Sequence, residues 1–194
     1  MTIVLGSASA RRKELLELLG YVFLVHPVDV DEQLNSYRNA EDFAHQVALK
    51  KGLATMVFHP EDLVICADTI VVLEDKILGK PEDLPAARKM IGSLSGKTHH
   101  VITGVFLNYQ DYQKVFTEKT QVRIDQMSAA EVEVYINTKE PYDKSGGYAI
   151  QGIFGKHVKG IHGDFYNVMG LPINRLYREI KKIESKYKIS FPRK

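Results

Sequence analysis

Hydrophobic residues in the first third of the chain predict a strand, a turn and two helices. The apolar run over residues 3–5 indicates a buried strand, and the leucines between residues 15 and 19 indicate a helix after a turn. Residues 22–33 are expected to be extended, because Pro27 is not tolerated inside a helix. A second helix is predicted from residue 41 to about residue 57, where apolar side chains recur on one face.

The middle of the chain has the pattern of strands followed by a helix. The apolar run at residues 63–67 predicts a strand that ends at Asp68. Residues 69–81 are expected to form a hairpin that turns at residues 74–76. A helix is then predicted over residues 84–94, because a Ser-Gly pair closes it.

The second half begins with β-rich runs and ends with an amphipathic helix. The runs at residues 101–109 and 115–124 are joined by polar residues, so they predict an antiparallel hairpin. Ser128 and Glu131 have the spacing of a capping box, which opens another helix. A final helix is predicted from residue 173, where apolar residues form one stripe.

Together these elements predict an α/β protein with a mixed β-sheet and flanking helices. The length of 194 residues suits one domain, and we expect residues 1–194 to form a single domain with two lobes. The basic tail, residues 186–194, is expected to be solvated.

Composition narrows the class of protein. A hydrophobic content of 44% and a net charge of +2 are typical of a soluble globular protein and do not indicate a polyanionic partner. The single cysteine, Cys66, excludes an internal disulfide and a multi-cysteine metal site. No signal peptide is evident, and no run approaches the roughly 20 apolar residues that span a membrane, so a cytoplasmic protein is expected.

The turn after the first strand carries cations at an unfavourable place. Arg11, Arg12 and Lys13 stand at a helix N-terminus, where the helix dipole disfavours each cation by roughly 0.3–1 kcal/mol. Ser7 and Ser9 offer hydroxyls there, and the free N–H groups of a helix N-terminus suit an anion. A polyphosphate would explain the arginines; the alternative is that they point into water. The spacing of a Walker A loop is absent.

Two acidic positions are candidates for catalysis or metal binding. Asp68 follows a buried strand, and the carboxyl end of such a strand is a favoured site in α/β proteins; the alternative is that it caps the next turn. Asp31 and Glu32 end an extended run and offer a second carboxylate. A Mg²⁺ site typically combines one or two carboxylates with waters and substrate phosphates.

Lysines and one glutamine complete the candidates. Lys50 and Lys51 both lie near the apolar face of their helix, and periodicity does not choose between them. Lys80 is either a ligand-binding residue or a solvated loop lysine. Gln151 follows two glycines and carries a donor and an acceptor that suit a nucleobase edge; a plain turn is the alternative.

These stretches together resemble the Maf family of nucleoside triphosphate pyrophosphatases. The matching pieces, in family order, are GSASARRKELL, VDVDE, ALKK, ICADTIVVLEDKILGKP, LSGKTHHVITGV, EPYDKSGGYAIQG and NVMGLP. The resemblance implies the elongated ITPase-like fold of the family, with two lobes around a central cleft. It also implies hydrolysis of a nucleoside triphosphate to the monophosphate and pyrophosphate, a divalent cation (Mg²⁺ or Mn²⁺), and a homodimer.

The resemblance also implies roles for single residues. It implies that Asp68 is the catalytic aspartate and that Glu32 and Asp68 hold the metal. The combination of Arg12, Thr69 and Gln151 resembles the subfamily that acts on dTTP and UTP. The substrate-binding residues that it implies are Ser7, Arg11, Arg12, Lys51, Thr69, Lys80 and Gln151.

The sequence therefore predicts an enzyme that hydrolyses dTTP and UTP, with modified pyrimidine nucleotides as further candidates. One alternative is a pyrophosphatase for 7-methyl-GTP. Another is a non-enzymatic regulator that binds nucleotides or nucleic acid through the basic turn. The low net charge and the lack of aromatic platforms beside the turn argue against a nucleic-acid partner. Asp164 departs from the family pattern and receives no role.

Overall fold

The computed structural model describes residues 1–194 and contains a seven-stranded mixed sheet. The strands are β1 (Ile3–Leu5), β2 (Phe23–Val25), β3 (Leu63–Leu73), β4 (Lys76–Leu78), β5 (Thr98–Tyr109), β6 (Tyr112–Ile124) and β7 (Val158–His162). The helices are α1 (Ala10–Glu17), α2 (Ala40–Met56), α3 (Leu84–Leu94), α4 (Ala129–Ile136), α5 (Phe165–Met169) and α6 (Ile173–Tyr187), with 3-10 helices at Glu140–Asp143, Ser145–Gly147 and Ile153–His157. The predicted α/β class is confirmed.

The strand order is β2-β1-β3-β5-β6-β7, and β4 pairs with β3 outside this order. The chain divides into two compact units. Unit 1 comprises Met1–Asp68, Thr103–Glu118 and Gly170–Lys194, and unit 2 comprises Thr69–Ile102 and Lys119–Met169. No helix is both long enough and apolar enough to cross a membrane.

The residue that follows β1 in unit 1, Gly6, lies where no side chain fits. β1 pairs in parallel with β2 and β3, so that Leu5 lies opposite Val25 and Ile65. The next residue, Gly6, donates its N–H to the carbonyl of Ile65 at 2.8 Å. A Cβ at Gly6 would lie 2.3 Å from the sulfur of Cys66, so a side chain is excluded there. This close approach places the following turn directly at the end of β1.

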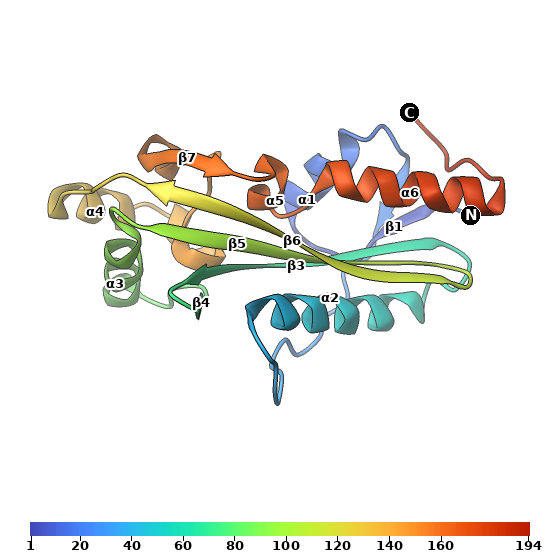
Figure 1. Cartoon of the computed structure of the whole chain (residues 1–194), viewed down its shortest axis with the longest axis horizontal. Helices are drawn as coiled ribbons and strands as arrows, with labels where there is room; N and C mark the ends of the chain where they lie inside the picture. The colour runs from blue at the N-terminus through green and yellow to red at the C-terminus, as the bar shows by residue number, and fades with distance from the viewer. The chain divides into compact units, whose positions relative to one another are not determined.

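Helices α2 and α6 cover opposite faces of the strands in unit 1 (Figure 1). Helix α2 lies so close to β5 that a Cβ at Gly104 would be 2.1 Å from the carbonyl oxygen of Ala44. Helix α6 buries the apolar stripe that its sequence predicts, including Leu176 and Ile180 at 0% exposure. The predicted helices over residues 41–57 and from residue 173 are therefore confirmed.

The expectation that the basic C-terminal tail is solvated holds for its lysines and its arginine, which are exposed, but not for Phe191. Phe191 is buried, its ring packs against Tyr109 with centroids 5.5 Å apart, and its N–H donates to Glu184 at 3.1 Å. Arg193 forms an isolated antiparallel bridge with Tyr21. Burying this one aromatic side chain contributes about 2 kcal/mol and anchors the tail, while its cations stay exposed to water.

Unit 2 contains the predicted hairpin between β3 and β4. Glu74 and Asp75 occupy the turn with φ values of 49° and 65°, which are the left-handed conformations that a tight two-residue hairpin turn requires. The turn therefore forms without a glycine. The strand that was expected to end at Asp68 instead continues to Leu73, because Thr69 and the β-branched residues after it also favour a strand.

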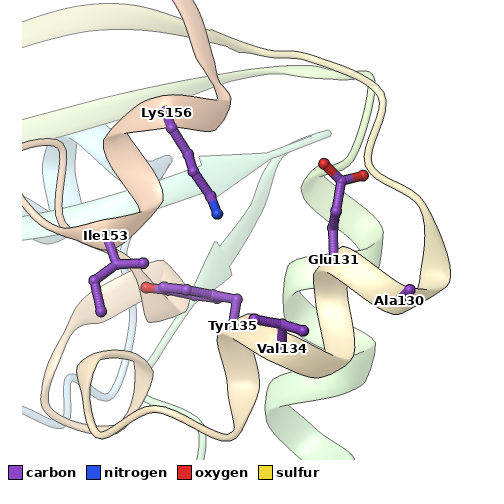
Figure 2. Close-up of a pocket in the computed structure, with 6 residues that line it drawn as sticks. All are labelled: Ala130, Glu131, Val134, Tyr135, Ile153 and Lys156. Atoms are coloured by element: carbon purple, nitrogen blue, oxygen red, sulfur yellow. The ribbon is translucent and has the colours of Figure 1, made fainter.

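A surface pocket of unit 2 lies between α4 and the 3-10 helix that begins at Ile153. It has a volume of about 250 Å³, and its lining is Ala130, Glu131, Val134, Tyr135, Ile153 and Lys156 (Figure 2). Ser128 and Glu131 form the predicted capping box at the start of α4. The pocket is thus built on a helix whose start is firmly capped.

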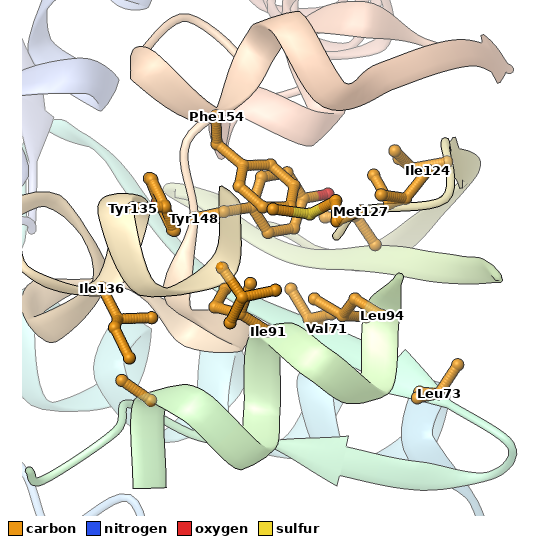
Figure 3. Packing of buried hydrophobic residues seen from close by; sticks show 14 residues of the cluster. Val71, Leu73, Ile91, Leu94, Ile124, Met127, Tyr135, Ile136, Tyr148 and Phe154 are labelled. Carbon is orange, nitrogen blue, oxygen red and sulfur yellow. The ribbon is translucent and has the colours of Figure 1, made fainter. Parts of the chain in front are cut away.

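The core of unit 2 packs α3 and α4 against Tyr148, which follows the second 3-10 helix, and Phe154, which lies in the third (Figure 3). Phe154 is fully buried, with its ring centroid 4.9 Å from that of Tyr135 and 4.8 Å from that of Tyr148. Ile91 and Ile136 supply the aliphatic side of this cluster. The segment around Phe154 is therefore anchored in the core.

Candidate active site

Lys51, Asp68 and Glu32 form an ionic cluster in unit 1. The Nζ atom of Lys51 lies 2.7 Å from Oδ1 of Asp68 and 2.7 Å from Oε1 of Glu32. The side chains of Lys51 and Asp68 are only 14% and 9% exposed, whereas that of Glu32 is 59% exposed. The pair of Lys51 with Asp68 is therefore shielded from water, and Glu32 closes the cluster on the solvent side.

The helical pattern of α2 explains why Lys51 points inward. The buried residues of this helix include Val47, Ala48 and Thr55, which recur on the face that packs against the strands. Lys51 lies three and four residues from these positions, so it extends from the edge of the same face, whereas Lys50 is exposed. The structure thus distinguishes the two lysines that periodicity left open.

Asp68 lies within β3 at a place that β1 no longer covers. β1 ends at Leu5, opposite Ile65, and Asp68 is three residues further along β3. Its carboxylate is buried and meets Lys51 there. β3 continues past Asp68, but its parallel pairing with β1 ends three residues earlier, at Ile65, so Asp68 lies beyond the carboxyl end of β1.

The basic turn follows β1 and carries Arg11, Arg12 and Lys13. Within it, Arg12 donates hydrogen bonds to two neutral groups. The Nε–H of Arg12 donates to the carbonyl of Gly170 at 3.0 Å, and Nη1 donates to the Ser7 hydroxyl at 3.2 Å. Ser9 caps α1, because its hydroxyl accepts from the N–H of Arg12. The guanidinium therefore folds back over the start of the helix. These two acceptors orient the guanidinium group and do not neutralise its positive charge.

The turn has an excess of positive charge. Burial lowers the pKa of Arg12, while the negative charge of Asp68 opposes this and the positive charge of Arg11 adds to it. The first turn of α1 contains no acidic residue. An anion that bound here would relieve both the repulsion between the arginines and their unfavourable position on the helix dipole.

Three predicted residues belong to unit 2. Thr69 follows Asp68 on β3 and is half-buried. Lys80 is exposed in the loop after β4, where the carbonyl of Gly79 accepts a hydrogen bond from Gly146 at 2.9 Å. Gln151 is also exposed. Their contact with substrate stays a prediction from the sequence.

Gly170 and Asp164 received no role from the sequence, and the structure shows what each of them binds. The carbonyl of Gly170 holds Arg12, and a backbone acceptor of this kind leaves no side-chain signal in a sequence. Asp164 accepts from the N–H groups of Tyr166 at 2.7 Å and of Asn167 at 3.2 Å, so it caps α5. The sequence could have indicated this capping role, because aspartate just before a helix is a frequent N-cap.

The carboxylates of Asp68 and Glu32 are the oxygen donors of the cluster. No group of three or more His, Cys, Asp or Glu side chains is arranged to hold a metal ion. Two carboxylates that share one cation nevertheless fit a hard divalent ion, since Mg²⁺ commonly takes its other ligands from water and phosphate. Lys51 already shows that both side chains reach a single positive charge.

Comparison with known proteins gives the family. The sequence model described as Maf-like protein matches residues 2–183. A dTTP/UTP pyrophosphatase of Bacillus cytotoxicus is 46% identical over 182 residues, which cover 94% of this chain and 95% of that protein. One of Bacillus cereus strain AH187 is 43% identical over 180 residues, 93% of this chain and 94% of that protein.

A solved structure supports the fold. The Ham1 protein of Staphylococcus aureus superposes with a TM-score of 0.54 over 94% of this chain and 99% of its own, at 14% identity. At that identity the likeness concerns the fold alone. The motifs from GSASARRKELL to NVMGLP and the matches that span nearly the whole sequence agree: this chain belongs to the family of Maf-like proteins.

Proposed function

We propose that this protein is a nucleoside triphosphate pyrophosphatase that hydrolyses dTTP and UTP to the monophosphate and pyrophosphate. Relatives that are 43–46% identical carry the name dTTP/UTP pyrophosphatase. The structural observation that carries the proposal is Lys51 bound 2.7 Å from Asp68, in the same unit as the oriented Arg12. Such a set of groups suits the hydrolysis of a phosphoric anhydride, because the cations can bind the phosphates and the carboxylate can orient the attacking water.

In the proposed enzyme, the basic turn and the N-terminus of α1 bind the phosphates. Guanidinium groups match phosphate oxygens in geometry, and the N-terminus of α1 adds N–H groups and a favourable dipole. In our proposal Arg11, Arg12 and Lys51 face the triphosphate, and Ser7 orients Arg12. The three cations exceed the two carboxylates by one charge, so an anionic ligand is favoured.

A divalent cation, Mg²⁺ or Mn²⁺, is part of the proposal. Asp68 and Glu32 would hold it, together with phosphate oxygens. When bound, the ion supplies positive charge at the phosphate and favours ionisation of a bound water. Lys51 keeps the two carboxylates close enough to share one cation.

Asp68 has the central role in the proposed reaction. It orients a water for attack on the α-phosphorus; the new bond joins the water oxygen to that phosphorus, and the bond to the β-phosphate oxygen breaks. The proton of the water passes to solvent or to the carboxylate. A carboxylate is a weak base, so orientation of the water is the main contribution of Asp68. Arg11, Arg12 and Lys51 stabilise the charge that develops on pyrophosphate.

Thr69, Lys80 and Gln151 remain proposed substrate contacts. The amide of Gln151 can pair with the O4 and N3–H edge that uracil and thymine share. These bases differ by one methyl group, which is worth about 1–3 kcal/mol, so discrimination between uracil and thymine through Gln151 should be small.

The remaining proposals follow the family resemblance. We propose that the two units are the lobes of a single domain and that the protein acts in the cytoplasm as a homodimer. No stable nucleic-acid partner is expected, because the net charge is only +2.

The test is an assay of the purified protein with UTP, dTTP, 7-methyl-GTP and ATP, each with and without Mg²⁺ or Mn²⁺. We expect equal amounts of monophosphate and pyrophosphate from UTP and dTTP, dependent on the metal. Release of orthophosphate would contradict the proposed bond cleavage. Preference for 7-methyl-GTP would contradict the proposed substrate class.

A further inference from the structure

Glu140 binds the backbone of the segment that follows Gln151. Its Oε2 accepts from the N–H of Ile153 at 2.7 Å, and its Oε1 accepts from the N–H of Phe154 at 3.3 Å. The Tyr135 hydroxyl lies 3.1 Å from the same Oε1. One carboxylate therefore caps the 3-10 helix that begins at Ile153 and ties it to α4.

Gly152 fits between Gln151 and this carboxylate. A Cβ at Gly152 would lie 2.2 Å from Oε2 and 2.4 Å from Oε1 of Glu140, so no side chain fits while the carboxylate keeps its bonds. The N–H of Gly152 also donates to the carbonyl of Ala149 at 3.1 Å, which closes a turn with Gln151 as its third residue. Gln151 thus precedes a residue that is restrained on two sides.

The interior side of the segment is equally restrained. Phe154 is fully buried against Tyr135 and Tyr148 (Figure 3). The hydroxyl end of Tyr135 points toward the segment that carries Ile153 (Figure 2). Burial, together with the negative charge of Glu140, raises the pKa of Tyr135 well above its ordinary value, so the hydroxyl remains a donor. The side chain of Gln151 is exposed on this restrained turn.

We propose that Glu140 is a positioning residue that sets the orientation of the Gln151 amide and thereby the pyrimidine preference of the enzyme. This inference rests on the proposed function. Glu140 acts through the turn, because its carboxylate is occupied by backbone N–H groups. An amide that reads a base edge must be held within fractions of an ångström, and a capped turn achieves this.

Two variants disturb this arrangement in different ways. Glu140→Gln replaces one acceptor oxygen by an NH₂ group that cannot accept, and Gly152→Ala leaves the carboxylate intact but displaces it. In both variants we expect KM for UTP to rise about tenfold while kcat changes less than about twofold. Inhibition by inorganic tripolyphosphate should be unchanged, because this compound lacks a nucleobase and so makes no contact with Gln151. Glu131→Gln is the matched control, since glutamine also completes a capping box.

A double-mutant cycle with Gln151→Ala separates positioning from a general structural role. If Glu140 acts through Gln151, adding Glu140→Gln to Gln151→Ala should change KM for UTP by less than about twofold. Independent, multiplicative effects would overturn the inference, and so would a parallel loss of tripolyphosphate inhibition or of kcat with a lowered Tm. Wild-type protein that releases no pyrophosphate from UTP would instead overturn the proposed function itself.

Discussion

The ammonium group of Lys51 lies 2.7 Å from Oδ1 of Asp68, and both side chains are largely shielded from water. The pairing compensates both charges, because an unpaired buried ion loses its hydration without compensation. The pair also fixes a helix residue against a strand residue. Structure and proposed chemistry therefore depend on the same contact.

Replacing Lys51 by methionine should affect both stability and activity. The carboxylates of Asp68 and Glu32 would lose their shared cation and repel each other. We expect the free energy of unfolding in urea to fall by roughly 3 kcal/mol and kcat/KM for UTP to fall at least about 100-fold. Lys50→Met, on the exposed side of the same helix, is the control and should stay near wild type. Equal effects of the two variants would contradict the prediction.

Asp68→Asn should separate binding from turnover. The amide is nearly isosteric, and its oxygen still accepts from Lys51, but its charge is lost. We expect release of pyrophosphate from UTP to slow by about 10³-fold or more, while a non-hydrolysable UTP analogue binds within a few-fold of wild type. Asp31→Asn, an exposed neighbour of Glu32, is the control. Wild-type turnover by Asp68→Asn would remove this residue from the reaction.

Arg12→Lys should weaken substrate binding although it keeps the charge. Lysine cannot reproduce the two separate contacts of Arg12 with Ser7 and Gly170. We expect KM for UTP to rise about tenfold, since one charged hydrogen bond is worth about 1.5–3 kcal/mol. Lys13→Ala removes an exposed cation from the same turn and should change KM less than about twofold. If both variants weaken binding equally, general electrostatic attraction explains the basic turn.

Gly6→Ala should destabilise unit 1. The new methyl group would lie 2.3 Å from Sγ of Cys66 and 2.7 Å from Oγ1 of Thr55, both in the buried interior. Overpacking of this kind typically costs about 1–3 kcal/mol. Gly92→Ala, in α3 with no atom within 4 Å of the new methyl, should instead stabilise by up to about 1 kcal/mol. Urea unfolding of both variants tests the contrast, and a neutral Gly6→Ala would refute it.

His99 should make stability depend on pH. Burial, and to a lesser extent His100, lowers the pKa of His99 to about 4, whereas in the unfolded chain it protonates near 6.5. Between these values the unfolded state binds more protons, so stability is lost as pH falls from about 6.5 to about 4, by roughly 3 kcal/mol in total. In His99→Gln this part of the pH dependence should disappear, while His162→Gln, an exposed control, should retain it. Identical slopes in all three proteins would rule out His99.

Much of the fold could be predicted, because residues close together in the sequence determine many of its helices and turns. The stripe of α6, the capping box of Ser128 and Glu131, and the hairpin at residues 74–76 all depend on residues close in sequence. The course of β3 through Asp68 was missed because an acidic residue ordinarily interrupts a strand, and its partner Lys51 lies on another element. The burial of Phe191 in the otherwise exposed tail was missed for a related reason, since its ring packs against Tyr109 of a distant segment.

The candidate site shows the same limit. Motifs identified Arg12 and Lys51, but some of the groups that orient them lie on other parts of the chain. The acceptor for Arg12 is a backbone carbonyl at residue 170, and side-chain patterns do not reveal backbone acceptors. Glu140 was part of a recognised motif, yet its bonds to Ile153 and Phe154 become evident only when the chain is folded.

The discontinuous make-up of unit 1 has a consequence for biosynthesis. Unit 2 ends at Met169, whereas unit 1 still requires the stretch from Gly170, including α6 and the buried Phe191. A nascent polypeptide that has emerged from the ribosome as far as residue 169 therefore contains every residue of unit 2, but leaves the apolar strands of unit 1 without α6. Until translation supplies that helix, those strands are the part of the chain that a chaperone would have to shelter.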